Sequence, residues 1–124
     1  GAGQAQAGAQ AMSYVAYGRT QNRVESQRQI EYRLLAQVTG ALIAARDAPK
    51  DKRKLFDAVL WNQKVWDAFL HDLSGDGNRL PLELRKRLIA ICLSVRRETA
   101  AVIDGKGDVE GLIQVNRNIM EGLR

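Results

Sequence analysis

The chain has 124 residues, a formal net charge of +5 and a pI near 9.7, with 45% hydrophobic and 27% charged residues. Its one cysteine, Cys92, excludes an internal disulfide and a metal site built from cysteines, and it suits a reducing cytoplasm. No apolar run is long enough for a membrane span or a secretory signal, so we expect neither. The basic balance favours acidic partners, which include nucleic acid and acidic protein surfaces.

The first eleven residues, GAGQAQAGAQA, contain only glycine, alanine and glutamine and precede Met12. A segment without charged or bulky apolar side chains has nothing to anchor it in a core. We therefore interpret residues 1–11 as a disordered linker ahead of a native start at Met12. The remaining 12–124 are enough for a single domain with its own core.

Apolar periodicity predicts an all-α fold, because the apolar residues recur at helical spacing and no segment alternates like a strand. Prolines and paired glycines separate four such segments. We expect a small single-domain bundle of about four helices, preceded by an N-terminal arm over residues 12–25. The expected helices run from about Ser26 to Arg46, from after Pro49 to about Leu73, from Pro81 to about Val102, and from a cap at Asp108 to about Leu123.

Three stretches together resemble the bacterial flagellar FlaF family of small regulators of flagellin production. They are EYRLLAQVTGAL at 31–42, the central run VWDAFLHDLSGDGNRLPLELRKRLIAICLSV at 65–95, and GLIQVNRNIMEGLR at 111–124. The central run is the most distinctive, because a Trp-x-x-Phe-x-x-Asp-Leu helix end leads through an asparagine-containing turn into Leu-Pro. The matching residues there are Trp66, Phe69, Asp72, Leu73, Asn78, Leu80 and Pro81.

The resemblance implies a cytoplasmic, non-enzymatic protein that supports flagellin synthesis and filament assembly. Members of the family are thought to act after transcription, with or against the partner regulator FlbT, and by contacting flagellin itself. No binding motif of the family maps onto particular residues of this chain. The resemblance therefore predicts the partners, flagellin and FlbT, without predicting the surface that binds them.

The stretch DLSGDGNRLPLE nearly fits an EF-hand calcium loop, with Asp72, Gly77 and Glu83 at positions one, six and twelve. Leu80, however, offers no side-chain oxygen at position nine, and Pro81 fixes the backbone at position ten. No second loop is present to pair with it. We therefore interpret the stretch as a joint between two helices and expect no metal and no cofactor.

Catalytic chemistry has little support in the sequence. His71 is the only histidine, at the polar end of its helix, and we expect it to be a solvated surface residue. Cys92 lies close to an apolar stripe, which favours a buried and unreactive thiol. The prediction is that the protein is not an enzyme.

Nucleic-acid binding is the alternative function, in the form of an RNA-associated regulator of flagellin messenger RNA. The basic runs lie at 50–54, 85–87 and 96–97, and acidic residues lie within or close beside each of them. At about 100° per residue, the side chains of 85–87 point to three different sides of one helix. A continuous basic stripe with stacking aromatics does not form, so nucleic acid is possible but not favoured.

Binding of a partner protein fits the sequence better. The core stripe of the second helix places Trp61 and Val65 on nearly the opposite side, where a tryptophan beside small apolar residues is typical of an interface anchor. Leu93 and Ile43 are apolar residues on the backs of their helices. We predict a partner-binding surface of Trp61, Val65, Leu93 and Ile43 that accepts an amphipathic helix. The alternative is that this helix is central and buries both of its sides.

One polar residue, Asn116, interrupts the apolar stripe of the last helix. A buried amide without hydrogen-bond partners costs free energy. We therefore expect Asn116 to be satisfied inside the core, by backbone groups.

Overall fold

Four α-helices joined by short turns make up the part of the chain that the computed structural model describes, residues 17–124, with side chains described from Ser26 onward. No strand occurs within these residues, and the predicted all-α bundle is confirmed. The predictions for residues 1–11 and for most of the arm lie outside the described residues. The helices are α2 (Tyr17–Arg46), α3 (Lys52–Ser74), α4 (Leu82–Ile103) and α5 (Val109–Leu123).

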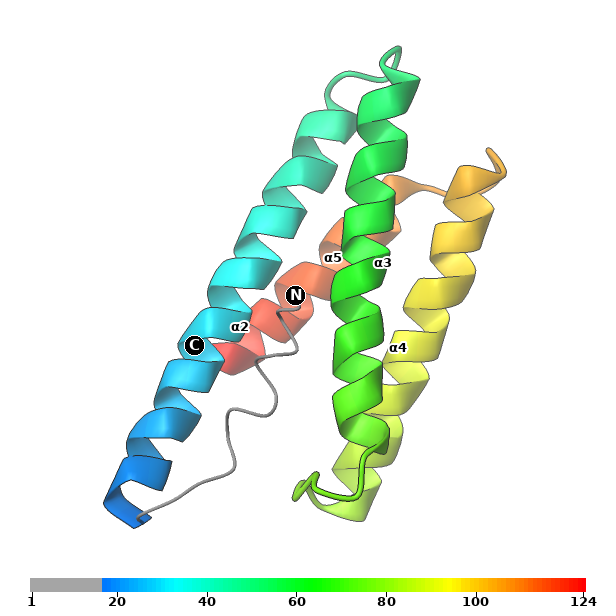
Figure 1. Ribbon diagram of the computed structural model, residues 1–124. Coiled ribbons are helices and arrows are strands. Elements are labelled where there is room, and N and C mark those ends of the chain that lie inside the picture. The colour runs from blue at the N-terminus through cyan, green and yellow to red at the C-terminus, as the bar shows by residue number, and fades with distance from the viewer. Residues whose placement is uncertain (1–16) are drawn as a thin grey trace.

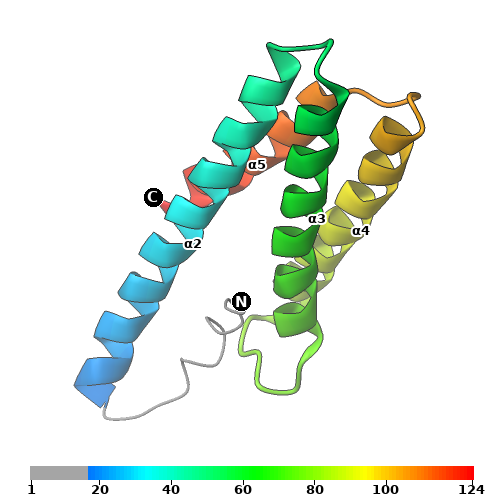
Figure 2. The same cartoon turned by 45° about the horizontal axis from the view of Figure 1, so that its top comes forward.

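The helices form a ring in which each packs on two neighbours (Figure 1). The first three run up, down and up, so that α3 lies between α2 and α4. The last helix, α5, crosses obliquely behind α2 and α3 and closes the ring by packing on α2 and α4 (Figure 2). One face of α3 therefore points into the ring, and its two flanks meet different helices.

The start of α2 differs from the prediction. The helix begins at Tyr17 rather than Ser26, so the described end of the predicted arm is helical. Residues 17–29 carry almost no apolar periodicity, and a start signal based on an apolar stripe misses them. Their many glutamines and arginines are good helix formers, which favours continuation of the helix without a packing partner. In both ribbon views the first turns of α2 diverge from α3.

Side-chain caps define the starts of two helices. Asp51 precedes α3 and accepts a hydrogen bond from the Lys54 backbone N–H at 3.0 Å. Asp108 precedes α5, as predicted, and its Oδ1 accepts from the Glu110 backbone N–H at 2.9 Å. Such caps satisfy amide groups that have no partner within the helix. Helix α4 begins one residue after its expected start, with Pro81 as the residue before the first turn.

The turn between α4 and α5 depends on two glycines. Gly105 has φ +77°, a conformation that glycine adopts without the penalty of a side chain. At Gly107 an added Cβ would lie 2.8 Å from the backbone nitrogen of Val102 and 2.9 Å from the Cβ of Ala101. The Asp108 backbone N–H donates to Glu98 Oε2 at 3.1 Å. The turn thus holds the start of α5 tightly against α4.

All four helices contribute to a single apolar core. Aliphatic side chains dominate it, and the free thiol of Cys92 lies within it. Asn62 and Asn116 are fully buried among these side chains. The largest fully buried apolar side chains are Leu35, Val38, Leu42, Val59, Val95, Leu112 and Ile113.

Candidate functional site

A buried polar cluster connects three helices at the centre of the bundle. Trp66 Nε1 on α3 donates to Asn116 Oδ1 on α5 at 2.9 Å. The Asn116 amide in turn donates to Asn62 Oδ1 at 2.8 Å and to Thr39 Oγ1 on α2 at 3.0 Å. Phe69 packs edge-on against the Trp66 ring, with the centroids 5.4 Å apart. Asn116 therefore ties α2, α3 and α5 together.

The location predicted for Asn116 is confirmed, but its predicted partners are wrong. It is buried and hydrogen-bonded, yet the partners are side chains rather than backbone groups. The reason is that Asn116 and its neighbours all lie within regular helices. The backbone N–H and C=O groups near its side chain are therefore already paired within their own helices. Two residues of the family resemblance, Trp66 and Phe69, belong to this interior, which gives them a structural role.

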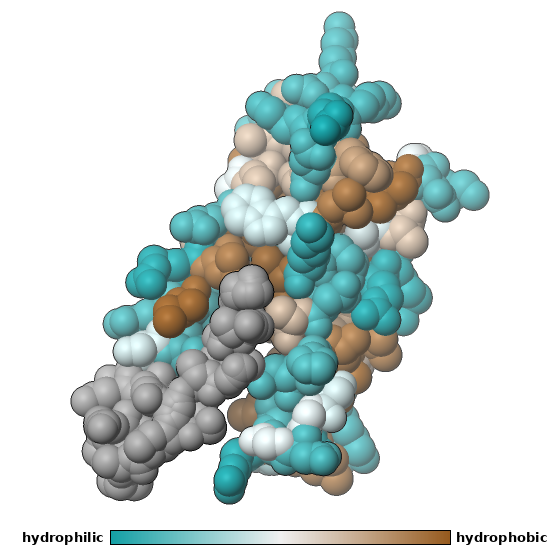
Figure 3. All heavy atoms as spheres, in the orientation of Figure 1, coloured by the Kyte–Doolittle hydropathy of each residue, from teal (hydrophilic) through white to brown (hydrophobic). Residues whose placement is uncertain are grey.

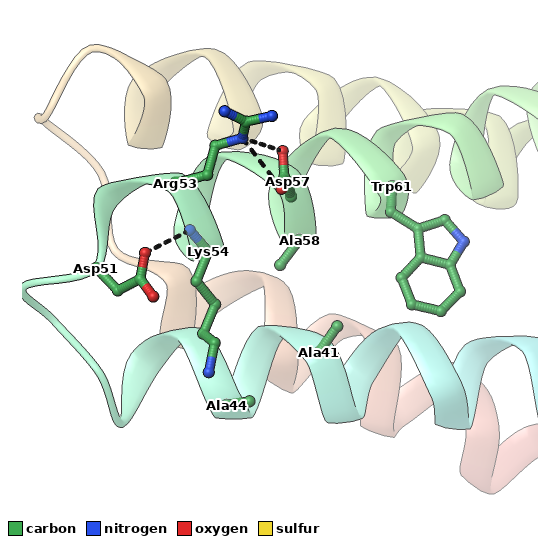
Figure 4. A pocket seen from close by; sticks show the side chains of 8 residues that line it. All are labelled: Ala41, Ala44, Asp51, Arg53, Lys54, Asp57, Ala58 and Trp61. Carbon is green, nitrogen blue, oxygen red and sulfur yellow. Dashed lines mark hydrogen bonds and ion pairs between the residues drawn. The ribbon is translucent and has the colours of Figure 1, made fainter.

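An open groove of about 510 Å³ lies between α2 and α3, near the turn that connects them. Ala41 and Ala44 of α2 and Ala58 of α3 form its apolar floor (Figure 4). Trp61 and Lys54 both project from α3 toward α2, and they flank this floor along the groove. The Trp61 side chain is 39% exposed. A large aromatic side chain therefore borders an apolar opening that small side chains leave free.

The charges at the groove are unevenly engaged. Arg53 and Asp57 form an ion pair with Nε to Oδ1 at 3.2 Å. Asp51 uses a carboxylate oxygen to cap α3. Lys54, by contrast, forms no ion pair within the described residues, and its side chain is exposed. The ammonium group of Lys54 at this end of the groove is therefore free to pair with an acidic group of a ligand.

The four residues predicted for the partner surface do not form one surface. Val65 is only 5% exposed, so the expectation that it faces outward is wrong. Its position is buried because α3 is covered on two flanks, by α2 and by α4. Ile43 is half-buried against the core, and Leu93 is 40% exposed on α4, which does not border the groove. Of the four, only Trp61 lines the groove.

A second apolar surface, which sequence reasoning missed, lies at the seam between α3 and α4. Arg96 Nη2 and Asp67 Oδ1 bridge that seam at 2.9 Å. Leu60 precedes Asp67 by two turns and Ile103 follows Arg96 by two turns, so both flank the same seam. With Phe56 they are exposed, and Figure 3 shows apolar side chains where the upper ends of α3 and α4 meet. The signal in the sequence that could have predicted this surface is that these apolar residues lie off the apolar stripes of their helices.

The loop between α3 and α4 is a hydrogen-bonded joint, as interpreted. Asn78 donates from its amide to Asp72 Oδ2 at 3.3 Å, and its Oδ1 accepts from the Leu80 backbone N–H at 3.0 Å. Gly77 does not have a positive φ. Within residues 17–124, no three acidic, histidine or cysteine side chains are grouped to hold a metal ion. Asp72 and Asn78, both part of the family resemblance, thus shape the joint.

Cys92 and His71 are the two side chains that the sequence analysis considered for catalysis. Burial raises the pKa of the Cys92 thiol to about 11, so the thiol stays protonated near neutral pH. His71 is exposed on the last turn of α3.

The basic residues considered for nucleic-acid binding are partly paired with acids, since Lys86 pairs with Glu83 and Arg96 pairs with Asp67.

The fold and the groove define a small all-α protein with an apolar opening between two helices. Within the described residues, none of the helices is both long and apolar enough to cross a membrane. A family model described as flagellar protein FlaF matches residues 13–123, and the chain therefore belongs to the FlaF family. Membership gives it a role related to the flagellum. No curated protein and no solved structure matches the sequence.

Proposed function

We propose that this protein is a non-catalytic adaptor in the synthesis and export of flagellin, and that the α2–α3 groove binds an amphipathic helix of flagellin or of the partner regulator FlbT. The observation that carries the proposal is Trp61 at the edge of the alanine floor. Exposed tryptophans beside apolar pockets are enriched among the residues that dominate binding energy. Acting on flagellin before its export places the protein in the cytoplasm.

Helix-in-groove recognition accounts for the shape of the site. Two helices with alanines on facing sides leave a shallow channel along their seam, and an incoming helix can lay its apolar face into that channel. The terminal segments of flagellin are suitable ligands because they form amphipathic helices that need cover before assembly. A chaperone-like role follows from covering such a helix reversibly.

The proposal is tested by the affinity of the purified full chain for purified flagellin, measured by calorimetry, for the wild type and for Trp61→Ala. We expect Trp61→Ala to weaken binding by at least about tenfold, since loss of a central aromatic anchor costs about 2 kcal/mol or more. The matched control is Phe56→Ala, which removes another exposed aromatic side chain of α3 outside the groove. Unchanged binding by Trp61→Ala, or an equal loss in both variants, would refute the groove as the site.

The same preparations test the RNA alternative. Binding of flagellin messenger RNA that weakens steeply with salt would favour a regulator that contacts phosphates directly. We expect no such binding, because the basic side chains of α4 are dispersed and partly paired with acids.

A further inference from the structure

Gly40 lies inside α2, six residues before its last residue, Arg46, at a position where glycine is unfavourable. Glycine in a helix interior destabilises a protein relative to alanine, because the unfolded chain loses more freedom on folding. At Gly40 an added Cβ would meet nothing within 4 Å, and its φ is not positive. The residue is exposed. Neither packing nor backbone conformation within the described protein requires a glycine there.

Gly40 lies on the exposed side of α2 next to the groove and does not itself line it. It directly precedes the lining residue Ala41 and lies one turn before the lining residue Ala44. Helices approach each other more closely where their contact residues are small, and a missing Cβ permits direct contact with the backbone. A helix that crosses α2 at this point would use the space that Gly40 leaves open.

Apart from Asp51, which caps α3, the charged side chains around the groove that form no ion pair within the described residues are positive. Arg33 lies two turns before Gly40 on the same face of α2, and Lys64 lies one turn after Trp61 on α3. Neither of them, nor Lys54, forms an ion pair within the described residues, and all three are exposed. The acids at the groove are engaged, as described above for Arg53–Asp57 and the helix cap.

We propose that the groove binds an acidic amphipathic helix, which crosses α2 closely at Gly40, packs an apolar side chain beside Trp61 and places carboxylates near Lys54 and Arg33. This inference rests on the proposed function and specifies the chemistry of the partner. A second copy of the chain is a poor occupant. If the grooves of two copies faced each other, the lysine and arginine side chains of one would lie against those of the other, and like charges repel. Complementary charge also sets the orientation of the bound helix.

The test uses two synthetic helical peptides of about five turns with the same leucine and alanine face, one flanked by glutamates and the other by lysines. Binding to the full chain is followed by fluorescence anisotropy at low salt and at physiological salt. We expect the glutamate peptide to bind and the lysine peptide not to bind. Lys54→Glu should weaken the binding of the glutamate peptide several-fold, and the change from low to physiological salt should weaken this binding further. Equal binding of both peptides, or of neither, overturns the inference.

Gly40→Ala separates binding from stability. We expect this variant to melt a few degrees higher than the wild type, since alanine favours the helix, yet to bind the glutamate peptide at least about tenfold more weakly. The control is Gly122→Ala on α5, where an added Cβ also meets nothing within 4 Å. It should not melt lower than the wild type, and it should bind normally. A Gly40→Ala variant with wild-type affinity overturns the inference.

The outcomes distinguish this inference from the proposed function. If the glutamate peptide binds in the groove but flagellin and FlbT do not bind, the proposed function fails and the chemistry of the groove stands. If flagellin binds through Trp61 but Gly40→Ala and Lys54→Glu change nothing, the proposed function stands and the inference fails.

Discussion

Trp61 and Trp66 lie five residues apart on α3 and have opposite surroundings. Trp66 is 2% exposed, donates its indole N–H to Asn116 and packs on Phe69. Trp61 is 39% exposed, and its indole N–H makes no hydrogen bond within the described residues. Five residues correspond to about 140° around a helix, so the two rings cannot share a side.

The contrast separates the part of the molecule that maintains the fold from the part that is available to a partner. In the interior, Trp66 Nε1 and both ends of the Asn116 amide are hydrogen-bonded, and these bonds join three helices, while Asn62 Nδ2 is the one buried side-chain atom of the cluster without a partner in the described residues. At the groove, small side chains leave apolar surface uncovered beside a ring that has none of these contacts. Substitutions should therefore affect stability at one site and binding at the other.

The largest expected effect is on stability at Trp66. Trp66→Ala should lower the free energy of unfolding by about 3–5 kcal/mol, because it leaves a cavity and removes the donor to Asn116. Trp61→Ala should lower it by about 1 kcal/mol or less. Urea unfolding followed by circular dichroism measures both. Similar losses at the two positions would contradict the contrast.

Asn116→Ala should be the next most damaging change. It leaves Trp66 Nε1 and the Asn62 carbonyl oxygen buried without these partners, at a cost of about 2–4 kcal/mol. The matched control is Asn118→Ala on the exposed face of the same helix, which should change stability by about 0.5 kcal/mol or less. Urea unfolding measures both variants. A control that is as destabilising as Asn116→Ala would contradict the structural role of Asn116.

Gly107→Ala tests whether the tight turn is needed to hold α5, and with it Asn116, in place. Its Cβ would lie within 3.0 Å of backbone and side-chain atoms of α4, so we expect a loss of about 1–3 kcal/mol. Gly77→Ala in the α3–α4 loop is the control, since a Cβ there meets nothing within 4 Å. Thermal unfolding should separate the two, and a Gly107→Ala variant as stable as the wild type would show that the turn can relax.

The smallest predicted effect is a pH dependence at Glu31 of α2. Burial raises the pKa of Glu31 above its ordinary value of 4.5, and the nearby Asp72 adds to the rise, while a hydrogen bond from Gln27 opposes it. The folded state therefore holds this proton more tightly than the unfolded state. The stability it contributes is present below the unfolded pKa and is lost as the pH rises through the folded pKa.

Glu31→Gln should remove this loss. We expect the variant to melt higher than the wild type near neutral pH and the difference to shrink as the pH falls toward about 4. Melting temperatures of both proteins across that range provide the measurement. A difference that grows toward low pH would reverse the sign and contradict the assignment.

Most of the fold could be predicted from the sequence, because three of the four helices begin or end at strong local signals. Asp108 was predicted as a cap and is one, and Pro81 lies within one residue of the start of α4. The start of α2 could not be placed, since its first turns have no apolar stripe. The apolar periodicity of one helix indicates which of its sides faces the core, but it does not indicate how many other helices pack against it.

The site was less predictable for the same reason. Val65 points away from the stripe centred on Val59 and Trp66, yet a second neighbouring helix covers it. The hydrogen bonds of Asn116 join residues fifty and more positions apart, and no local pattern specifies such pairs. Trp61 was identified because a large aromatic residue off the stripe is informative even without the packing.

We infer that Trp61, and not Trp66, changes its surroundings when a partner helix binds. The chain has only two tryptophans, so their fluorescence tests this directly with a flagellin fragment that contains none. We predict that emission shifts to shorter wavelength on binding as Trp61 loses water, and that Trp61→Phe abolishes the shift. A shift that persists in Trp61→Phe, or saturable binding with no shift in the wild type, would contradict the claim.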